Sequence, residues 1–179
     1  MIRPATGNDL PSFFAYLNDH LADNGVGGTA LFMPMPRSAS FFPPDKVSAF
    51  RAGVETPVGQ PGWRRLWLAF GSDGEIAGHI DLRARPETPA AHRALLGMGV
   101  HRNARRQGLG ARLIGAARAW AEAQALSWID LEVLSVNHAA RQLYASCDFE
   151  QVGEIPDMFR IDGEPLGYTF MTLKLSCSI

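Results

Sequence analysis

The feature that most constrains this chain is a short segment rich in glycine and arginine, at residues 100–111. It lies between an apolar strand pattern and a long helical pattern, and Gly108 and Gly110 stand where the helical pattern begins. Glycines leave backbone amides uncovered, and a helix start concentrates unpaired N–H donors and partial positive charge, so this arrangement is suited to bind phosphate. Residues 88–121 contain six arginines and no acidic residue, in a chain of net charge −1. We expect an anionic ligand here; a plain tight turn into the helix is the structural alternative.

Apolar periodicity predicts a single α/β domain over residues 1–179. The predicted helices cover residues 10–21, 45–54 and 108–125, and a further helix follows Asn137. The predicted strands cover residues 2–5, 65–70, 75–83, 95–100, 128–134, 149–155 and 166–175. The order strand, helix, strand, helix over residues 95–147 predicts a parallel pair with a right-handed crossover.

Composition excludes several classes of function. The balance of 17 basic and 18 acidic side chains argues against nucleic-acid binding. Cys147 and Cys177 are too few and too distant for a disulfide framework, and the five histidines lack metal-ligand spacing, so we expect no metal. No apolar run approaches the ~20 residues of a membrane span, and the N-terminus lacks the apolar core of a signal peptide. These patterns predict a cytoplasmic protein without membrane contact.

Residues 24–44 form a long segment rich in glycine, proline and serine, with several embedded apolar side chains. A long apolar loop is more often a substrate lid or a partner surface than a linker. We therefore interpret it as a lid or partner surface. The alternative is that its apolar side chains belong to the hydrophobic core.

Two carboxylates occupy one face of the predicted strand 128–134. Asp130 and Glu132 alternate there with apolar residues that face the other way. Carboxylates in a central strand are costly unless that face opens to a cleft or the charges are paired. Burial would favour the protonated form of Glu132 and make it a candidate general base, whereas an ion pair with an arginine is the structural alternative.

Asn137 and Tyr144 are seven residues apart, so they share one face of the predicted helix. Taken alone, Asn137 is interpreted as a helix N-cap and Tyr144 as a core aromatic residue. His92 and His101 flank the strand 95–100 and could contact a ligand, although a solvated loop position explains either one.

Together these residues resemble the GCN5-related N-acetyltransferase (GNAT) superfamily. The acetyl-CoA loop of that family has the form Arg/Gln-x-x-Gly-x-Gly/Ala, which residues 105–110 match. The family's Asn-x-x-Ala-Arg-x-Leu-Tyr pattern is matched by residues 137–144, and Phe149 closes the next turn. The resemblance implies a mixed, mostly antiparallel sheet with splayed central parallel strands, flanked by helices.

The resemblance also implies roles for individual residues. Backbone groups of Met98 and Val100 would bind pantetheine, and Asn137 would contact it as well. Tyr144 would protonate the leaving CoA thiolate, and Glu132 stands where N-terminal protein acetyltransferases carry a general base. The pyrophosphate of acetyl-CoA would be held by the backbone amides of Arg105, Arg106, Gln107, Gly108, Leu109 and Gly110.

The sequence departs from the family pattern at three positions. The strand over residues 93–100 lacks the glutamate that many relatives carry, which leaves Glu132, His92 or water as the base. His101 replaces a frequent proline. Asp148 replaces the usual glycine before Phe149, and aspartate tolerates the left-handed conformation of a helix C-cap.

The reaction implied by the resemblance is acetyl transfer from acetyl-CoA to a primary amine of a small molecule or amino acid, by direct attack on the thioester. A protein N-terminal or peptide acetyltransferase is one alternative, and a non-catalytic acyl-CoA-binding regulatory module is another. We expect residues 24–44 and 155–168 to build the acceptor pocket. Edge strands near the C-terminus could form a homodimer.

Overall fold

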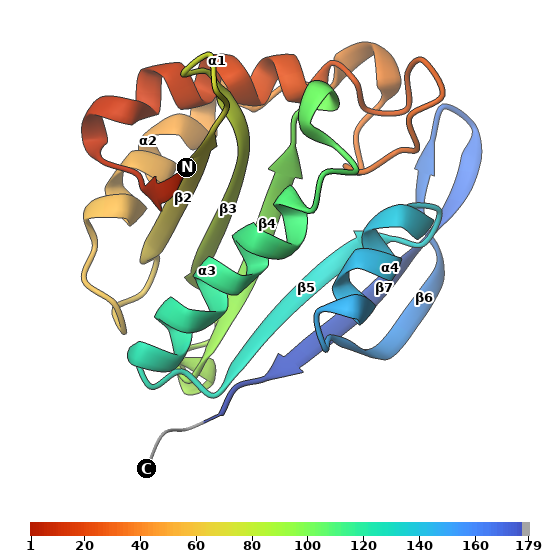
Figure 1. The fold of residues 1–179 in the computed structure, drawn as a ribbon. Helices are drawn as coiled ribbons and strands as arrows, with labels where there is room; N and C mark the ends of the chain where they lie inside the picture. The colour runs from red at the N-terminus through yellow and green to blue at the C-terminus, as the bar shows by residue number, and fades with distance from the viewer. Residues whose placement is uncertain (177–179) are drawn as a thin grey trace.

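A computed structural model describes residues 1–176 and confirms a mixed α/β fold (Figure 1). One seven-stranded sheet has the order β1-β2-β3-β4-β5-β7-β6, and every neighbouring pair is antiparallel except β4 and β5. The strands are β1 (Ile2–Pro4), β2 (Arg64–Phe70), β3 (Ile76–Ala84), β4 (Arg93–Val100), β5 (Trp128–Leu134), β6 (Glu150–Ile161) and β7 (Glu164–Lys174). The helices are α1 (Leu10–Leu21), α2 (Pro44–Glu55), α3 (Leu109–Ala123) and α4 (His138–Ser146).

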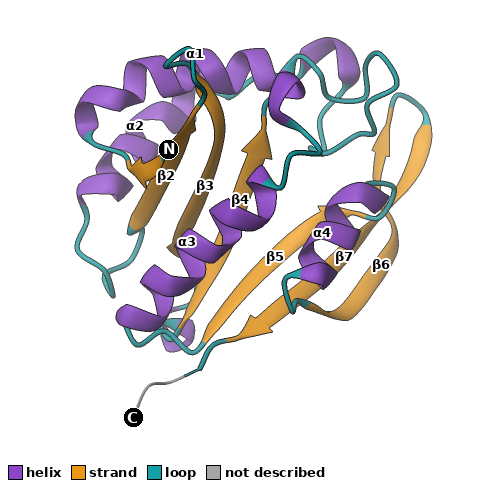
Figure 2. Ribbon diagram, in the orientation of Figure 1, coloured by secondary structure: helices purple, strands orange, loops and turns teal. Residues whose placement is uncertain are grey.

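Helices cover both faces of the sheet, as Figure 2 shows. Helices α3 and α4 lie on one face, where the apolar stripe of α3 packs against inward-facing residues of β2 to β5. Helices α1 and α2 lie on the other face and bury a second apolar cluster against β2. Side chains alternate between the faces of a strand, so Ile129 and Leu131 of β5 point toward α3 and α4, whereas Asp130 and Glu132 point away.

The central parallel pair separates soon after it forms. Strands β4 and β5 pair only at Arg93↔Trp128, Ala94↔Ile129 and Leu95↔Asp130. The remaining residues of β4 continue along β3 on the other side, as far as Val100 opposite Gly78. The sheet is therefore split between β4 and β5 toward the end that leads into α3, which confirms the expected splay.

Strand β6 is longer than the apolar pattern predicts. Residues 156–160 continue it to Ile161, but its register against β7 shifts between Ile155 and Phe159, and Asp157 has a φ of 49°. A bulge of this kind interrupts the alternation of apolar and polar residues, so the pattern stops at residue 155. Within residues 1–176, no helix is long and apolar enough to cross a bilayer.

Candidate active site

The segment between β4 and α3 folds as a backbone nest at the open end of the split. Arg106 and Gly108 both have left-handed backbone conformations, with φ of 60° and 72°, and Gly108 is the N-cap of α3. Gln107 closes the turn by donating from Nε2 to the Asn103 carbonyl at 3.1 Å. Successive amides in such a conformation converge on one point, where the helix start adds partial positive charge. A Cβ at Gly108 would meet nothing within 4 Å, so the nest opens to unfilled space.

Arg105 fixes this loop to the rest of the protein. Its guanidinium donates from Nε to the Val100 carbonyl at 3.1 Å and from Nη2 to Asp23 at 3.2 Å. Arg102 also pairs with Asp23, at 2.9 Å. The side chain of Arg105 is thus held against the end of α1, and its contribution to an anion site is a positioned backbone and a nearby positive charge.

Gly110 permits a close approach of three elements. A Cβ at this position would lie 2.7 Å from Cδ2 of Leu143 on α4 and 3.5 Å from Cε of Met98 on β4. Any side chain at position 110 would therefore displace Leu143. The glycine lets the start of α3 lie directly against α4 at the mouth of the split.

The free edge of β4 faces the split. The His92 carbonyl accepts from Ser127 on the β5 side, and the His101 amide donates to Ala77 on the β3 side. Backbone groups alternate in direction along a strand, so the amides and carbonyls of Met98 and Val100 point toward β5. Pairing with β5 has ended before both residues. The Val100 carbonyl accepts from Arg105, and the Met98 groups and the Val100 amide are left available to an extended ligand.

Tyr144 on α4 lies in the apolar cluster that also contains Met98 and Val100. It packs against Phe149 with ring centroids 5.8 Å apart. Burial raises the pKa of the Tyr144 phenol, and the neighbouring Tyr168 raises it further. The phenol therefore keeps its proton at neutral pH, as a proton donor must.

The two carboxylates of β5 have separate structural roles. Asp130 is buried and paired with Arg93 and Arg85, and it accepts a hydrogen bond from Thr172 at 2.7 Å. Burial by itself would raise the pKa of Asp130, but the hydrogen bonds from Arg93 and Thr172 and the two arginine charges lower it overall. Asp130 thus forms a structural ion pair with arginine, which is the alternative that the sequence left open for a carboxylate on this strand.

Glu132 is exposed, so the burial expected for it is not found. The physical reason is that no helix covers this face of β5 at that point, and Glu132 borders a hollow of about 350 Å³ together with Leu95 and Phe170. Its carboxylate is therefore within reach of a ligand that enters the hollow.

Tyr168 lies near Glu132, a position that the sequence patterns do not reveal. It lies on β7 opposite Leu134 of β5, on the same face as Glu132. Burial raises the pKa of Tyr168 to about 12, and the charge and hydrogen bonding of Glu132 contribute. Only the register of β5 against β7 brings these two residues together, so no linear motif announces the pair.

The sequence singled out His92 as a candidate base, but the buried histidines beside β4 are two others. His92 is exposed and precedes β4 at its paired end, a strand length of about 25 Å from Val100. His20 of α1 and His79 of β3, in contrast, are buried over Gly99, where a Cβ would approach each ring closer than 3 Å. Burial lowers the pKa of both imidazoles to about 3, so both are neutral at pH 7.

Residues 24–44 form a wall beside the split. The buried Asn24 side chain organises this wall: it accepts from the amides of Phe32 and Met33 and donates to the Met33 carbonyl and Ser40. Leu31 packs with Ile161 and Leu166 of the β6–β7 hairpin. The two segments expected to build the acceptor pocket therefore do meet.

An ion pair joins the wall to the hairpin as well. Arg37 contacts Asp162 at 2.9 Å and Glu164 at 3.1 Å. Asn137, at the other side of the split, accepts from the Ala140 amide at 3.3 Å and so caps α4, as expected for an N-cap.

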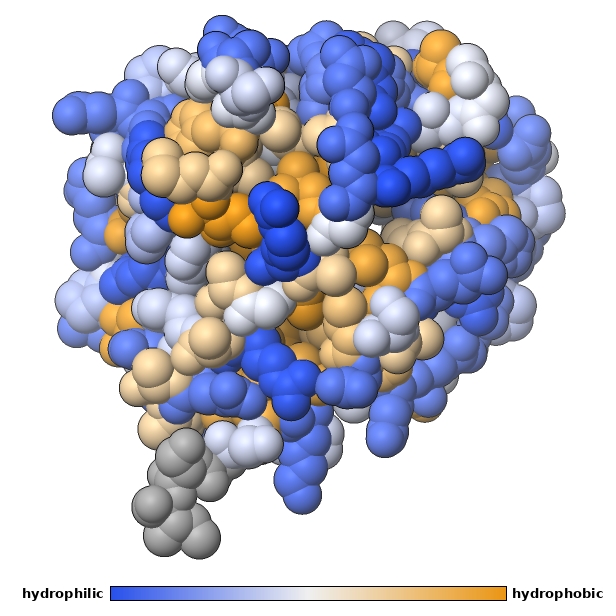
Figure 3. Space-filling view, viewed as in Figure 1, coloured by the Kyte–Doolittle hydropathy of each residue, from blue (hydrophilic) through white to orange (hydrophobic). Residues whose placement is uncertain are grey.

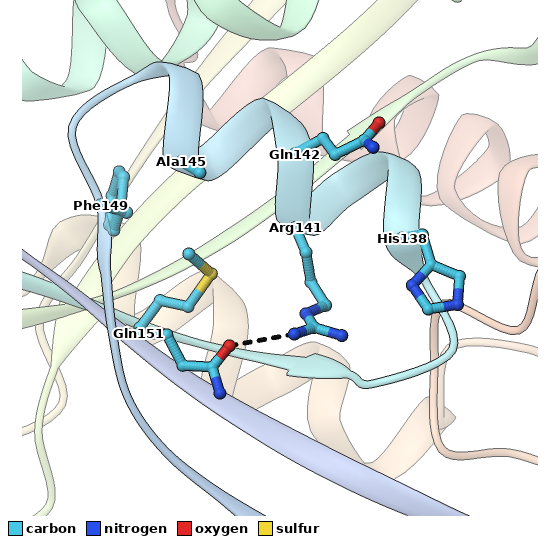
Figure 4. A pocket seen from close by; sticks show the side chains of 7 residues that line it. His138, Arg141, Gln142, Ala145, Phe149 and Gln151 are labelled. Carbon is cyan, nitrogen blue, oxygen red and sulfur yellow. Dashed lines mark hydrogen bonds between the residues drawn. The ribbon is translucent and has the colours of Figure 1, made fainter.

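Apolar residues gather in the hollow between α3 and α4, bordered by hydrophilic ones, as Figure 3 shows. Another hollow of about 350 Å³, separate from the one beside Glu132, lies between α4 and β6 (Figure 4). It contains Arg141, which donates to Gln151 at 3.0 Å, and none of the predicted site residues. Within residues 1–176, no cluster of three metal-binding side chains occurs.

Comparison with known proteins identifies the family. Residues 37–149 match the model of the acetyltransferase (GNAT) family, and the chain belongs to that family. Among curated proteins, it is 24% identical over 153 residues to an uncharacterized N-acetyltransferase, YycN, of Bacillus subtilis, a match that covers 84% of this chain and 92% of that protein.

Solved structures share the whole fold at low sequence identity. A GNAT-family acetyltransferase from Streptococcus pneumoniae superposes with a TM-score of 0.80 at 21% identity, covering 98% of this chain and 99% of the other. A ribosomal-protein-alanine N-acetyltransferase from Brucella melitensis gives 0.78 at 22% identity, with the same coverage. A phosphinothricin acetyltransferase from Sinorhizobium meliloti, solved with acetyl-CoA, gives 0.79 at 19% identity and covers 98% and 88%.

Proposed function

We propose that this protein is an acetyl-CoA-dependent N-acetyltransferase that acts on a primary amine. One observation carries the proposal: the unpaired edge of β4 runs directly into the nest at residues 105–110. A strand edge of free amides and carbonyls followed by a phosphate cradle matches an extended pantetheine attached to a pyrophosphate. Membership of the acetyltransferase family supports the same ligand.

Different residues of the chain bind different parts of that ligand. Amides from Arg105 to Gly110 hold the pyrophosphate, and the backbone groups of Met98 and Val100 orient the pantetheine. The Asn137 side chain, whose Oδ1 caps α4, contacts the pantetheine as well. Bound acetyl-CoA supplies an acetyl group activated as a thioester.

The two proton transfers of the reaction are assigned to Glu132 and Tyr144. Glu132 takes a proton from the acceptor ammonium, directly or through water, so the free amine can attack the acetyl carbon. As the carbon–nitrogen bond forms and the carbon–sulfur bond breaks, Tyr144 donates its proton to the leaving sulfur. The nitrogen loses its second proton in the same collapse, and that proton passes through solvent to restore the Tyr144 phenol. Positioning of the two substrates contributes most of the rate in such a direct transfer.

The test is release of free CoA thiol from acetyl-CoA across a panel of amines, amino acids and short peptides. We expect release that depends on the acceptor. Glu132→Gln should reduce it and flatten the acidic limb of the pH–rate profile, because an amide cannot accept the ammonium proton.

The matched control is Glu122→Gln, which changes a glutamate on the outer part of α3 that pairs with Arg118. Tight acetyl-CoA binding without acceptor-dependent release would favour a non-catalytic acyl-CoA-binding module. Release only with peptides would favour a peptide N-terminal acetyltransferase.

A further inference from the structure

On the face of the sheet that carries Glu132, two arginines share a single carboxylate. Asp81 of β3 is buried, and its Oδ2 accepts from Arg64 at 2.7 Å and from Arg83 at 3.4 Å. One carboxylate therefore serves two guanidinium groups, and Arg83 has the longer contact. The Arg83 side chain is also the more open of the two, with 34% of its surface exposed.

Gly97 brings the Arg83 guanidinium onto β4. A Cβ at position 97 would lie 3.1 Å from Nη1 of Arg83 and 2.7 Å from Oδ1 of Asp81. The missing side chain thus lets Arg83 reach the acceptor face of the strand. The neighbouring residue is Met98, whose backbone faces the split, so the positive charge lies beside the strand edge that is proposed to bind pantetheine.

Glu132 faces the same opening from the other side. It is exposed, and it forms no ion pair with any residue in the described range 1–176. Burial and Glu132 raise the pKa of Tyr168, whereas the Arg83 charge lowers it. The guanidinium of Arg83 and the carboxylate of Glu132 therefore shift the pKa of the same phenol in opposite directions.

The hollow beside Glu132 offers room for an apolar side chain. Its lining includes Leu95, Val152 and Phe170. The arginines in the same lining, Arg85 and Arg93, have two carboxylate partners between them, Asp130 and Glu87. Among the arginines on this face of β3 and β4, Arg83 is thus the more exposed of the two that share a single carboxylate.

We propose that the acceptor is an α-amino acid, with its ammonium at Glu132 and its carboxylate at Arg83. The inference rests on the proposed function, and it narrows the acceptor from amines in general to amines with an adjacent carboxylate. A zwitterion of this kind would neutralise both incompletely paired groups at once. A guanidinium also binds a carboxylate through paired N–H donors, which an uncharged substituent cannot replace.

The experiment compares acceptors that differ only at the carboxylate. Leucine is assayed beside isopentylamine and leucinamide, and phenylalanine beside phenethylamine and phenylalaninamide, by release of CoA thiol. Binding of leucine and isopentylamine to the protein saturated with CoA is measured in parallel by calorimetry. We expect kcat/KM and affinity to be at least about tenfold higher for the amino acids.

Arg83→Gln is the decisive variant. It should lower kcat/KM for leucine by about 10- to 100-fold and bring the ratio of leucine to isopentylamine close to one, with Arg83→Lys between the two. Arg118→Gln on α3, paired with Asp148 and Glu122, is the matched control and should keep the ratio. Thermal unfolding of each variant establishes that it is folded.

Equal use of the amine and the amino acid, or an unchanged ratio in folded Arg83→Gln, would overturn the inference and leave acetyl transfer to amines intact. Preference for the carboxamides or for peptide N-termini would overturn it as well. Failure of the proposed function is distinguishable, since acetyl-CoA itself would then not bind or no acceptor would release CoA.

Discussion

At the scale of single residues, the site depends on groups whose protonation is set by their surroundings. Tyr144 is buried among apolar side chains, which raises the pKa of its phenol, whereas Glu132 is exposed to solvent. In the proposed reaction the buried phenol is the proton donor and the exposed carboxylate is the proton acceptor.

Tyr144→Phe tests the proton donor. The substitution keeps the aromatic packing against Phe149 and removes only the hydroxyl, so we expect kcat to fall by about 10²-fold or more while the acetyl-CoA Kd is nearly unchanged. Steady-state kinetics and calorimetry measure the two effects. Wild-type turnover in this variant would remove Tyr144 as the acid.

Acid stability tests the buried imidazoles. His20 and His79 have folded pKa values near 3, below the value near 6.5 of an unfolded histidine. The unfolded state therefore binds more protons between pH 6.5 and 3, and stability is lost as pH falls through that window. At pH 5 each histidine should cost on the order of 1–2 kcal/mol.

Denaturant unfolding at pH 7 and pH 5 measures this loss. His79→Gln should show a smaller difference between the two pH values than the wild type. His92→Gln, at an exposed position, should leave the difference unchanged. An equal difference in all three proteins would contradict the assignment of the loss to the buried rings.

At the scale of elements, the turn between β4 and α3 converts a local sequence into a binding geometry. Gly108 adopts φ of 72° and faces open space, whereas Gly110 has a regular helical conformation and faces Leu143. The two glycines are thus needed for different reasons: the first for its backbone and the second for its lack of volume.

Gly108→Glu should weaken acetyl-CoA binding by about 10²-fold or more. A side chain there strains the left-handed backbone and places a negative charge in the phosphate nest. Calorimetry with acetyl-CoA measures the effect. Gly115→Glu is the control: it is exposed on α3 and a Cβ there meets nothing within 4 Å, so affinity should be retained.

Asn24→Ala tests the wall formed by residues 24–44. Its fully buried side chain accepts two backbone hydrogen bonds and donates to others, so its loss should cost about 2 kcal/mol or more of stability. Because the wall borders the acceptor side, KM for the acceptor should rise more than the Kd for acetyl-CoA. A comparable rise in both would show that the wall supports the whole fold instead.

At the scale of the whole molecule, long-range pairings assemble the site from distant parts of the chain. Arg105 is tied to Asp23, Arg37 to Asp162, and Glu132 lies beside Tyr168. Each tie joins two of the segments that surround the split between β4 and β5. The site is therefore a product of the sheet order, and no one segment contains it.

The sequence by itself determined the elements and the glycine-containing turn between β4 and α3. Strands, helices and glycine positions follow from short-range periodicity and backbone preference, so residues 105–110, Asn137 and Tyr144 could be placed on their elements without a structure. Even the left-handed Asp148, with φ of 68°, follows from its position at the end of α4. These features depend on neighbours within a few residues along the chain.

The tertiary structure alone decided which side chains meet. Glu132 was expected to be buried and is exposed, and Asp130 beside it is neutralised by Arg85 and Arg93, because burial depends on what covers a strand face. The approach of Arg83 to Gly97 and of Tyr168 to Glu132 depends on strand register. Register is set by the packing of the entire sheet, which no local pattern encodes.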